Sequence, residues 1–367
     1  MKIYIFGAHS RARTLWIYLH KIYPNFVLGG YLVNNDETNP DSIDNVKVIH
    51  IDRSGSYDFD LNADVYLGIR GIGHADAVKS LSELGFKNFI PVTPDLDTEL
   101  RNKFLNNYFS EKNKIFNKLE NNNRGCTIYV IRSVFDKPLA SDYTSFNNEV
   151  EIQVGVSMSD ARLKPLVGSQ DEFILCDNIG DNISDKNKQF CELTGLYWVW
   201  KNRCTNDDSL VGFVHYRRHF LLPDDWHIQW GERKIDVILP TPLYVQPSLL
   251  DNYRQRHIDS CLEYMFEWIA SEEEKGNTQY NKKKLLDFFK QPIYSPCNMF
   301  ITTNRIFADL CEWLFPILFA ISDHCGAFED AYQNRYPGFL AERLISYYFM
   351  DESKSYNIVY ADKNFLF

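Results

Sequence analysis

Short apolar runs, each long enough for one buried strand and each followed by a helical pattern, constrain the fold of this chain most strongly. The first run, Lys2–Phe6 (KIYIF), precedes a helical stretch over residues 11–23. Further strand runs lie at residues 26–33, 64–68 and 89–91. Strands that alternate with helices predict a parallel sheet with right-handed crossover connections. The sequence therefore predicts an α/β fold.

The same pattern starts again after a polar interruption. A charged helix is predicted over residues 96–120, and the run NNNRG at residues 121–125 has the composition of a linker. The apolar run TIYVIR at residues 127–132 then opens a second alternation. Because a domain usually holds about 100–200 residues, a chain of 367 residues predicts two domains. We assign a Rossmann-like accessory domain with a parallel sheet to residues 1–120 and a second α/β domain to residues 126–367.

Hydrophobic patterning predicts further elements in the second domain. The expected strands cover residues 151–156, 173–176, 210–214, 236–239 and 298–302. The expected helices cover residues 187–201, 249–271, 305–322 and 338–350. In the helix at 187–201, the residues Phe190, Leu193, Tyr197 and Trp200 fall on one face, and we interpret this face as core. Residues 272–284 are expected to form an exposed connection.

Composition and charge exclude several classes of function. The net charge is −10 and no long basic run occurs, which argues against nucleic acid as a partner. The eight cysteines show no zinc-type spacing and are typical of reduced thiols. The most apolar segment, residues 306–322, contains Asp309, Glu312 and Pro316 and is shorter than the ~20 apolar residues of a membrane-spanning helix. With no recognisable signal peptide, we expect a soluble, cytoplasmic protein.

The turn after the first strand partly matches a dinucleotide-binding fingerprint. Gly7 and Ala12 occupy the first and third glycine positions, but His9 replaces the middle glycine, whose missing Cβ would let the backbone approach a pyrophosphate. One interpretation is a bound nucleotide cofactor. We favour the other, in which the first domain is an accessory module that has lost its ligand.

A cluster of cationic side chains follows a strand of the second domain. The apolar run at residues 210–214 ends in His215-Tyr216-Arg217-Arg218. Ligands of open α/β sheets bind beyond the carboxyl ends of the strands, and arginine suits phosphate because its planar fork donates paired hydrogen bonds. The cluster therefore predicts a pocket for a nucleotide diphosphate. The alternative is a surface network in which the two arginines pair with the acidic residues at 224 and 225.

Two long runs resemble a known family. The runs GDNISDKNKQFCELTGLYWVWKN (residues 180–202) and VGFVHYRRHF (residues 211–220) are similar to signatures of a bacterial capsule and exopolysaccharide glycosyltransferase family. That family was long catalogued as a domain of unknown function and includes galactofuranosyltransferases. The later runs IDVILP, CNMFIT, EWLFPIL and NRYPGFLAERL also fit, so the resemblance covers roughly residues 126–367.

The resemblance implies a fold and a reaction. It implies a GT-A-like nucleotide-sugar domain, preceded by a Rossmann-like leader domain of the kind found on some sugar-modifying enzymes. The reaction would move galactofuranose or another hexose from a UDP-sugar to a surface polysaccharide, namely capsule, exopolysaccharide or O-antigen. A lipid-linked or oligosaccharide acceptor is compatible with peripheral contact at the inner face of the cell membrane.

The residues expected to contact the donor lie along the second domain. They are Arg132, Gly155, Asp177, Lys186, His215, Tyr216, Arg217, Arg218, Asn298 and Arg343. Glu192 and Thr194 are further candidates for shaping this pocket. Family members tend to carry a His-Lys pair where this chain has Arg132-Ser133, so the donor-base contacts near the first strand transfer least.

An inverting transfer needs a group that deprotonates the acceptor hydroxyl. Glu342 is the leading candidate, because it lies in an apolar stretch where burial would raise the pKa of its carboxyl group. Asp181 and His257 are the reserves. Alternatively, Glu342 pairs with Arg335 or Arg343 and only anchors its helix.

Metal ligands are not obvious in the second domain. Many GT-A enzymes hold Mg²⁺ or Mn²⁺ on an Asp-x-Asp motif, but none occurs after residue 124. The motifs at residues 58–60 and 95–97 lie in the first domain. We expect positive side chains to do much of the metal's work on the diphosphate, with a metal held by Asp177 and Asp181 as the alternative.

Two rival functions remain open from the sequence. One is a non-catalytic scaffold or nucleotide-sensing subunit of a polysaccharide assembly complex, built from two degenerate nucleotide-binding folds. The other is an NAD-linked sugar oxidoreductase that uses the turn at Gly7, against which the missing middle glycine argues.

Overall fold

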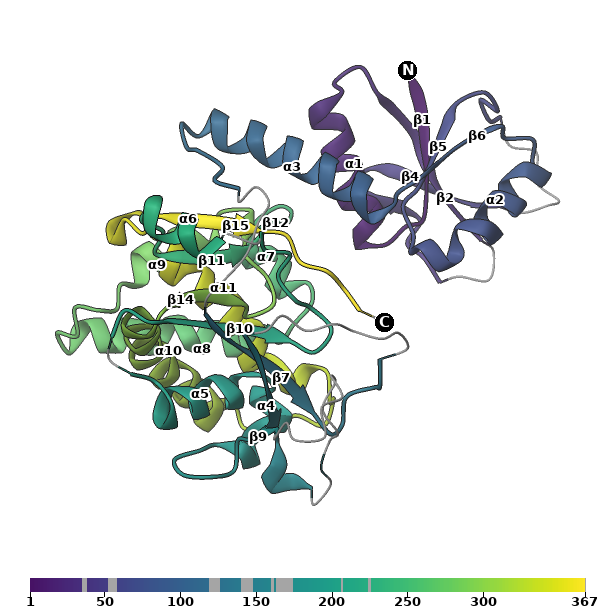
Figure 1. The fold of residues 1–367 in the computed structure, drawn as a ribbon. Helices are drawn as coiled ribbons and strands as arrows, with labels where there is room; N and C mark the ends of the chain where they lie inside the picture. Colours follow the sequence, from purple (N-terminus) through teal and green to yellow (C-terminus); the bar gives the residue numbers. More distant parts are fainter. Residues whose placement is uncertain are drawn as a thin grey trace. The chain divides into compact units, whose positions relative to one another are not determined.

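The computed structural model describes residues 1–34, 38–51, 58–118, 126–139, 148–159, 162, 174–205, 207–223 and 226–366. The chain forms two compact units, Met1–Phe116 and Asn117–Phe367 (Figure 1). The linker predicted at residues 121–125 and the acidic pair at 224 and 225 lie outside the described residues.

The N-terminal unit is a parallel sheet flanked by helices. Its strands are β1 (Lys2–Phe6), β2 (Val27–Asn34), β3 (Ser42–Ile43), β4 (Val46–Ile51), β5 (Asp64–Leu67) and β6 (Asn88–Pro91). Its helices are α1 (Ser10–Ile22), η1 (Gly71–Gly73), α2 (His74–Glu83) and α3 (Pro94–Glu111). The strand order is β3-β4-β2-β1-β5-β6, and all pairs are parallel except the short β3–β4 pair. The order reverses between β1 and β5, which are neighbours at the centre of the sheet.

Helix α3 is shorter than the predicted helix. It begins at Pro94, where the Thr93 hydroxyl accepts a hydrogen bond from the Leu96 amide, and it ends at Glu111. Two residues later Asn113 has φ 54, a left-handed conformation that stops the helix. The prediction of a helix up to residue 120 is therefore wrong.

The C-terminal unit has a larger sheet of seven strands. These are β7 (Thr127–Ser133), β8 (Glu149–Val154), β9 (Leu175–Cys176), β10 (Leu210–His215), β11 (Val237–Pro240), β14 (Phe300–Thr303) and β15 (Ile358–Ala361). Their order is β15-β11-β14-β10-β7-β8-β9. Only β14 runs antiparallel to its neighbours (Figure 1). The order reverses between β7 and β10. A separate ribbon pairs β12 (Leu243–Tyr244) with β13 (Ile293–Tyr294).

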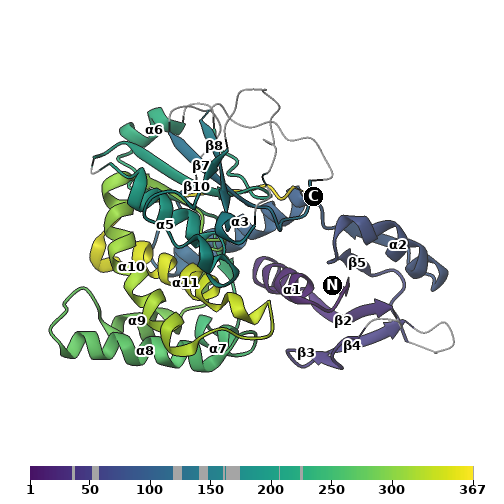
Figure 2. The same cartoon turned by 90° about the horizontal axis from the view of Figure 1, so that it is seen from below.

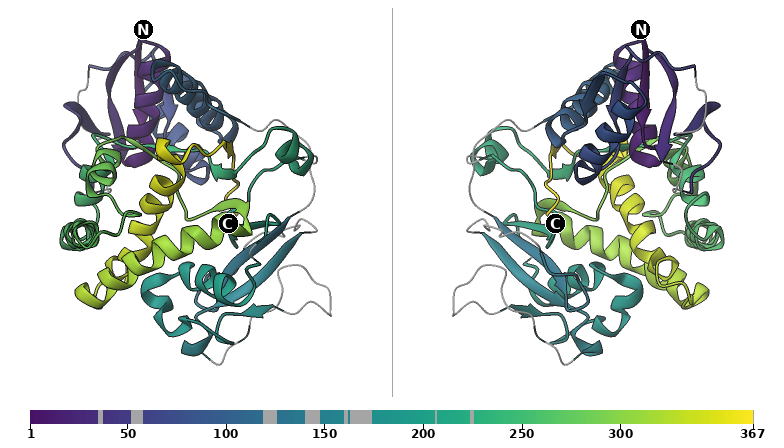
Figure 3. Two further views of the ribbon diagram at one scale, coloured as in Figure 1. Left: turned by 90° about the vertical axis from the view of Figure 1, so that its left-hand side faces the viewer. Right: turned by 90° about the vertical axis from the view of Figure 1, so that its right-hand side faces the viewer.

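Helices pack around this sheet and against one another. They are α4 (Asn187–Phe190), α5 (Leu193–Asn202), α6 (Trp226–Glu232), α7 (Leu249–Arg254), α8 (Asp259–Glu274), α9 (Lys282–Phe289), α10 (Asn304–Cys325) and α11 (Tyr336–Met350). Short 3₁₀ turns are η2 (Val156–Met158), η3 (Ser184–Lys186), η4 (Gln333–Arg335) and η5 (Glu352–Lys354). Helix α10 packs against α8 on one side and α11 on another (Figures 2 and 3). None of the helices in the described ranges is both long and apolar enough to cross a membrane.

Several predicted elements of this unit are corrected by the structure. The exposed connection predicted at residues 272–284 instead contains the end of α8, the buried Tyr280 and the start of α9. The helix predicted at 187–201 is interrupted between α4 and α5, where Cys191 has φ 50. The helix predicted at 249–271 is divided into α7 and α8. The strand predicted to begin at Asn298 begins at Phe300, because Cys297 and Asn298 both adopt left-handed backbone conformations.

Candidate active site

A cavity of about 460 Å³ opens at the carboxyl ends of β7, β8 and β10 in the C-terminal unit. It is lined by Ile131, Ser133, Phe135, Asp136, Val154, Asn187, Lys188, Cys191, Glu192, His215, Tyr216, Arg217, Arg218, Arg335 and Phe365. We call it the cationic cavity, because one lysine and three arginines face two carboxylates there. Its place, where the strand order reverses, is where open α/β sheets bind ligands.

The turn after β10 supplies four of the lining residues. It closes through hydrogen bonds from the Arg218 amide to the His215 carbonyl (2.9 Å) and from the His215 amide to the Arg218 carbonyl (3.1 Å). The Tyr216 amide donates to the Ile131 carbonyl of β7 (3.1 Å), which ties the turn to the neighbouring strand. The prediction that β10 delivers residues 215–218 at its end is confirmed by the strand bounds Leu210–His215.

Two further parts of the chain support the backbone of this turn. The fully buried His219 places Nδ1 2.7 Å from the Glu149 carboxylate and Nε2 3.3 Å from the Tyr216 carbonyl. The C-terminal segment runs alongside, with the Leu366 amide donating to the Arg217 carbonyl (2.8 Å) and the Asn364 amide to the His219 carbonyl (3.1 Å). The backbone of the turn is therefore held on three sides.

The guanidinium groups of Arg217 and Arg218 contact aromatic rings rather than carboxylates of the described residues. Within the described residues neither forms an ion pair with a carboxylate, and Arg217 Nε is buried without a hydrogen-bond partner there. Instead, Arg217 lies over the Tyr216 ring (5.2 Å) and Arg218 over the Phe365 ring (5.1 Å). Positive charge without a partner in a concave site favours an anionic ligand.

The break between α4 and α5 forms a second wall of the cavity. Asn187 accepts the Cys191 amide at its carbonyl, while its side-chain amide donates to the Cys191 carbonyl (2.7 Å). Arg335 Nε lies 3.0 Å from the Cys191 sulfur. Burial raises the pKa of the Cys191 thiol to about 12, so the thiol stays neutral and is no nucleophile near neutral pH. A continuous helix could not present both Cys191 and Glu192 to the cavity in this way.

A strained turn joins three polar residues beside the cavity. Cys297 (φ 79) and Asn298 (φ 50) are consecutive left-handed residues, each costing about 1–3 kcal/mol. The Cys297 carbonyl accepts a hydrogen bond from His215 Nε2. The Asn298 side chain donates to the Glu192 carboxylate (2.7 Å). The Cys297 amide donates to Glu342 Oε1 (2.8 Å). The turn thus links His215, Glu192 and Glu342.

Glu342 adjoins the cavity through this turn but is not among the lining residues. Its side chain is 22% exposed. Burial raises the pKa of its carboxyl group. The Arg343 charge, with Nη1 3.5 Å from Glu342 Oε2, lowers this pKa by a smaller amount. Arg335 contacts Cys191 instead. The pairing with Arg343 that the alternative expected is therefore present, and the role of Glu342 as a base stays a prediction.

The match to a known family lies within the C-terminal unit. Residues 137–354 match the family described as a domain of unknown function (DUF4422). The chain belongs to this family. Among solved structures, it is similar to the WbbM bifunctional glycosyltransferase in its apo form, with a TM-score of 0.52 and 25% sequence identity. No curated protein matches the chain.

The similarity to the glycosyltransferase structure covers 66% of this chain but only 45% of the other. The chain therefore spans less than half the length of the structure it matches. Together with the two mostly parallel sheets, this similarity confirms the predicted α/β fold class.

Asp136, Lys188 and Phe365 are among the lining residues that were not singled out from the sequence. Asp136 lies in the turn after β7, where its carboxylate accepts the Ser133 amide (2.7 Å) and burial raises its pKa. A polar residue just past a predicted strand was the available signal. Lys188 follows the predicted Lys186 by two residues. Phe365 carries no signal, since no local pattern links residue 365 to β10.

Asp177 and Gly155 do not line the cavity but stabilise the segments that form its wall. The fully buried Asp177 carboxylate accepts hydrogen bonds from the Gly155 and Val156 amides and from the hydroxyls of Ser184 and Thr194. Gly155 has φ 71, and a Cβ there would lie 2.7 Å from Asn187 Oδ1. These contacts attach the end of β8 to the segment that carries Cys191 and Glu192.

The remaining predicted donor residues also lie outside the lining. Arg132 is 14% exposed and sits 3.6 Å from the Glu151 carboxylate. Arg343 is buried between the rings of Tyr253 and Tyr294 and donates to the Phe339 carbonyl (2.7 Å). Lys186 ends η3. Asn298 contributes indirectly, through Glu192.

The reserve bases and the alternative metal ligands are placed elsewhere. Asp181 is exposed and accepts the Tyr197 hydroxyl (3.1 Å). Its neighbour in the alternative, Asp177, has both oxygens engaged by protein donors, so this pair does not fit a metal ion. Among the described residues no group of three or more acidic, histidine or cysteine side chains could hold one. His257 stacks on Phe339 (4.0 Å), and burial, with the Arg343 charge, lowers its pKa to about 4.

Proposed function

We propose that this chain transfers a sugar from a UDP-sugar, bound in the cationic cavity, to a growing surface polysaccharide. The observation that carries the proposal is the position of Arg217 and Arg218. They lie at the carboxyl end of β10, where the strand order reverses, without a carboxylate partner among the described residues. The similarity to a glycosyltransferase structure supports the same reaction class.

The cavity offers a division of roles for donor binding. The forks of Arg217, Arg218 and Arg335 are suited to the diphosphate oxygens. The rings of Tyr216 and Phe365 offer aromatic faces on which a base or a sugar can stack. His215 donates from Nε2 to the Cys297 carbonyl, since a carbonyl can only accept, and this orients the imidazole.

The transfer breaks the bond between the anomeric carbon and the diphosphate oxygen and forms a bond to the acceptor oxygen. The diphosphate leaves with both electrons of the broken bond, and the arginine cluster stabilises the negative charge that develops on it. Glu342 takes the proton of the acceptor hydroxyl. Its raised pKa brings it closer to the operating pH, which favours a general base. Attack from the face opposite the leaving group makes the reaction inverting.

The described residues do not supply a dedicated metal site, so we derive no step through a metal. In this proposal the cationic side chains carry the work on the diphosphate. Purified protein treated with EDTA should therefore keep most of its activity. Complete loss of activity that Mn²⁺ restores would contradict this part of the proposal.

Nucleotide binding by the purified full-length protein tests the proposal. A ligand that binds only the folded state raises the melting temperature by mass action, so the protein is heated with UDP, GDP, CMP or NAD, each with and without Mn²⁺. We expect a shift with UDP that disappears in the Arg217→Ala/Arg218→Ala variant. Arg305→Ala is the matched control, because this exposed arginine pairs with Asp208 and does not line the cavity.

Each outcome separates the rival functions. No shift with any nucleotide would favour the non-catalytic scaffold, and a shift with NAD alone would favour an oxidoreductase. If UDP binds, turnover of UDP-galactofuranose compared with UDP-galactose and UDP-glucose identifies the sugar.

A further inference from the structure

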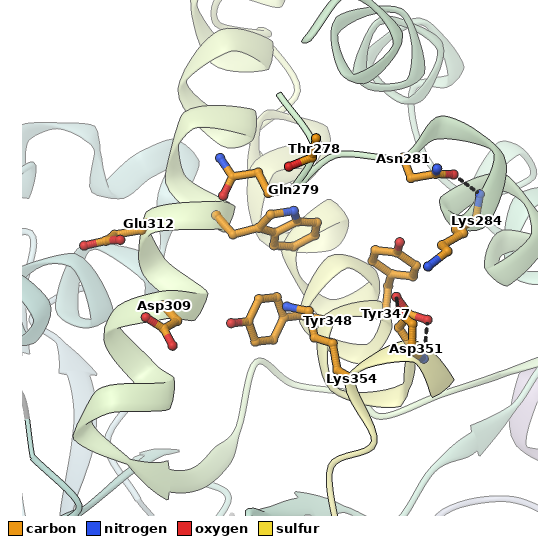
Figure 4. A pocket seen from close by; sticks show the side chains of 12 residues that line it. Thr278, Gln279, Asn281, Lys284, Asp309, Glu312, Tyr347, Tyr348, Asp351 and Lys354 are labelled. Carbon is orange, nitrogen blue, oxygen red and sulfur yellow. Dashed lines mark hydrogen bonds between the residues drawn. The ribbon is translucent and has the colours of Figure 1, made fainter. Parts of the chain in front are cut away.

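We propose that a second cavity of the C-terminal unit binds a segment of an oligosaccharide chain. This cavity holds about 350 Å³ and lies between α10, the C-terminal half of α11, η5 and the residues around the start of α9 (Figure 4). Its lining residues are Thr278, Gln279, Asn281, Lys284, Asp309, Glu312, Trp313, Tyr347, Tyr348, Asp351, Ser353 and Lys354. We call it the aromatic cavity. Its volume falls in the range of ~300–1,000 Å³ that is usual for small-ligand sites.

Aromatic rings form one side of this cavity. The Trp313 ring lies 5.9 Å from the Tyr347 ring and 5.4 Å from the Tyr348 ring, so the three rings make one contiguous apolar surface. Trp313 is nearly buried and is fixed further by Tyr280, whose hydroxyl donates to the Trp313 carbonyl (3.1 Å). A rigid aromatic surface is suited to the flat C–H faces of sugar rings, because it offers apolar contact at little entropic cost.

Five polar side chains face these rings. Asp309 and Glu312 lie on one turn of α10, Lys284 lies on the opposite side of the rings, and Thr278 and Gln279 lie above them in the view of Figure 4. In the described part of the chain, none of these five side chains forms a hydrogen bond or an ion pair with protein. Carboxylates, amides and hydroxyls that converge on an aromatic surface can bond neighbouring hydroxyl groups of a sugar.

The charge of the aromatic cavity distinguishes its ligand from a nucleotide. Three carboxylates (Asp309, Glu312 and Asp351) face two lysines, so the balance is opposite to that of the cationic cavity. Lys354 places its amine 3.0 Å from the centre of the Tyr348 ring, and burial lowers the pKa of this amine to about 8. The three carboxylates would repel a phosphate group but not an uncharged sugar. We therefore commit to a neutral, polyhydroxylated chain.

Helix α11 connects the two cavities. It follows directly on Arg335, a residue of the cationic cavity, and carries Tyr347 and Tyr348 near its other end. Fifteen residues at about 1.5 Å each give roughly 22 Å. If the proposed function is correct, the chain bound here is the growing acceptor, and binding at a second point would increase its affinity by raising the effective concentration of its end.

Glycan binding by the full-length protein tests this inference. The probe is an array of defined capsular and O-antigen fragments, followed by titration of the best-bound fragment in solution. We expect Asp309→Ala/Glu312→Ala to weaken binding about tenfold or more, since two hydrogen-bonding groups are lost. The matched control is Glu267→Ala/Asp323→Ala, which removes the same charge from exposed positions of α8 and α10 outside the cavity.

UDP binding, measured on the same samples, separates this inference from the proposed function. Retained UDP binding with the expected loss of glycan binding supports both. A wild-type protein that binds UDP but no fragment, or equal losses in the two variants, overturns the glycan site and leaves the donor proposal standing. Glycan binding that depends on Asp309 and Glu312 in a protein that binds no UDP keeps the site and overturns the donor proposal.

Discussion

The two α/β units offer the same kind of sheet edge but treat it differently. In each, the strand order reverses between two parallel neighbours, β1 and β5 in the first unit and β7 and β10 in the second. Beyond β1, Ile69 packs close to the backbone of the turn, because a Cβ on Gly7 would lie 2.8 Å from Ile69 Cγ2. Beyond β10, arginine side chains surround a cavity instead. The fold provides the edge, and the side chains at that edge decide whether it is a site.

Removal of the proposed base should have the largest effect. Glu342→Gln keeps an oxygen that can accept the Cys297 amide but cannot take a proton, so we expect kcat to fall about 100-fold or more. UDP affinity, measured by titration, should change less than about twofold because the donor residues are untouched. In the wild-type protein, activity should fall as pH decreases through the raised pKa of Glu342, above its ordinary value of 4.5.

Two matched variants identify a different base if Glu342 is not the one. Asp136→Asn and Glu192→Gln remove the carboxylates that line the cationic cavity. Activity that survives Glu342→Gln but is lost in Asp136→Asn would transfer the role to Asp136, whose pKa is also raised by burial.

Two glycine substitutions test whether the sheet edges of the two units differ in nucleotide binding. Gly7→Ala and Gly155→Ala both add a Cβ where φ is positive (114 and 71), and we expect each to destabilise the protein by about 1–3 kcal/mol. Only Gly155→Ala pushes on Asn187, which lines the cationic cavity, so only this variant should weaken UDP binding. Thermal denaturation and UDP titration measure the two effects. Weaker UDP binding in Gly7→Ala would contradict the assignment of the UDP site to the C-terminal unit.

The smallest effect is expected at His257. Its pKa of about 4 keeps the ring neutral above pH 5, and it stacks on Phe339 outside the cavity lining. His257→Gln should therefore leave the shape of the pH–rate profile between pH 5.5 and 8 unchanged. A limb of that profile that disappears in the variant would make His257 a participant in proton transfer.

Several strands and the turn at residues 215–218 could be predicted because the signal is local, whereas β4 and β15 were not predicted. A buried parallel strand is a contiguous apolar run, so β1 was predicted with its observed bounds and β10 to within one residue. Once the strands are parallel, residues at their carboxyl ends must share one edge. That rule places Arg217 and Arg218 correctly without knowledge of tertiary contacts.

The other walls of the cavity depend on contacts between distant parts of the chain. The helical spacing of Phe190, Leu193 and Tyr197 continues through Cys191, but the helix is interrupted there, where Asn187 and Arg335 contact Cys191. Phe365 reaches the cavity through backbone pairing with the turn after β10, almost 150 residues earlier in the chain. Asp177 was predicted to contact the donor, but its four protein donors make it a structural anchor.

Hydrogen–deuterium exchange of the full-length protein with and without UDP tests most directly which edge binds the nucleotide. We expect slower exchange on UDP binding in peptides that contain residues 187–192 and 215–218, and no change in the peptide that contains residues 7–12. Protection of residues 7–12 without protection of 215–218 would contradict it and move the nucleotide site to the N-terminal unit.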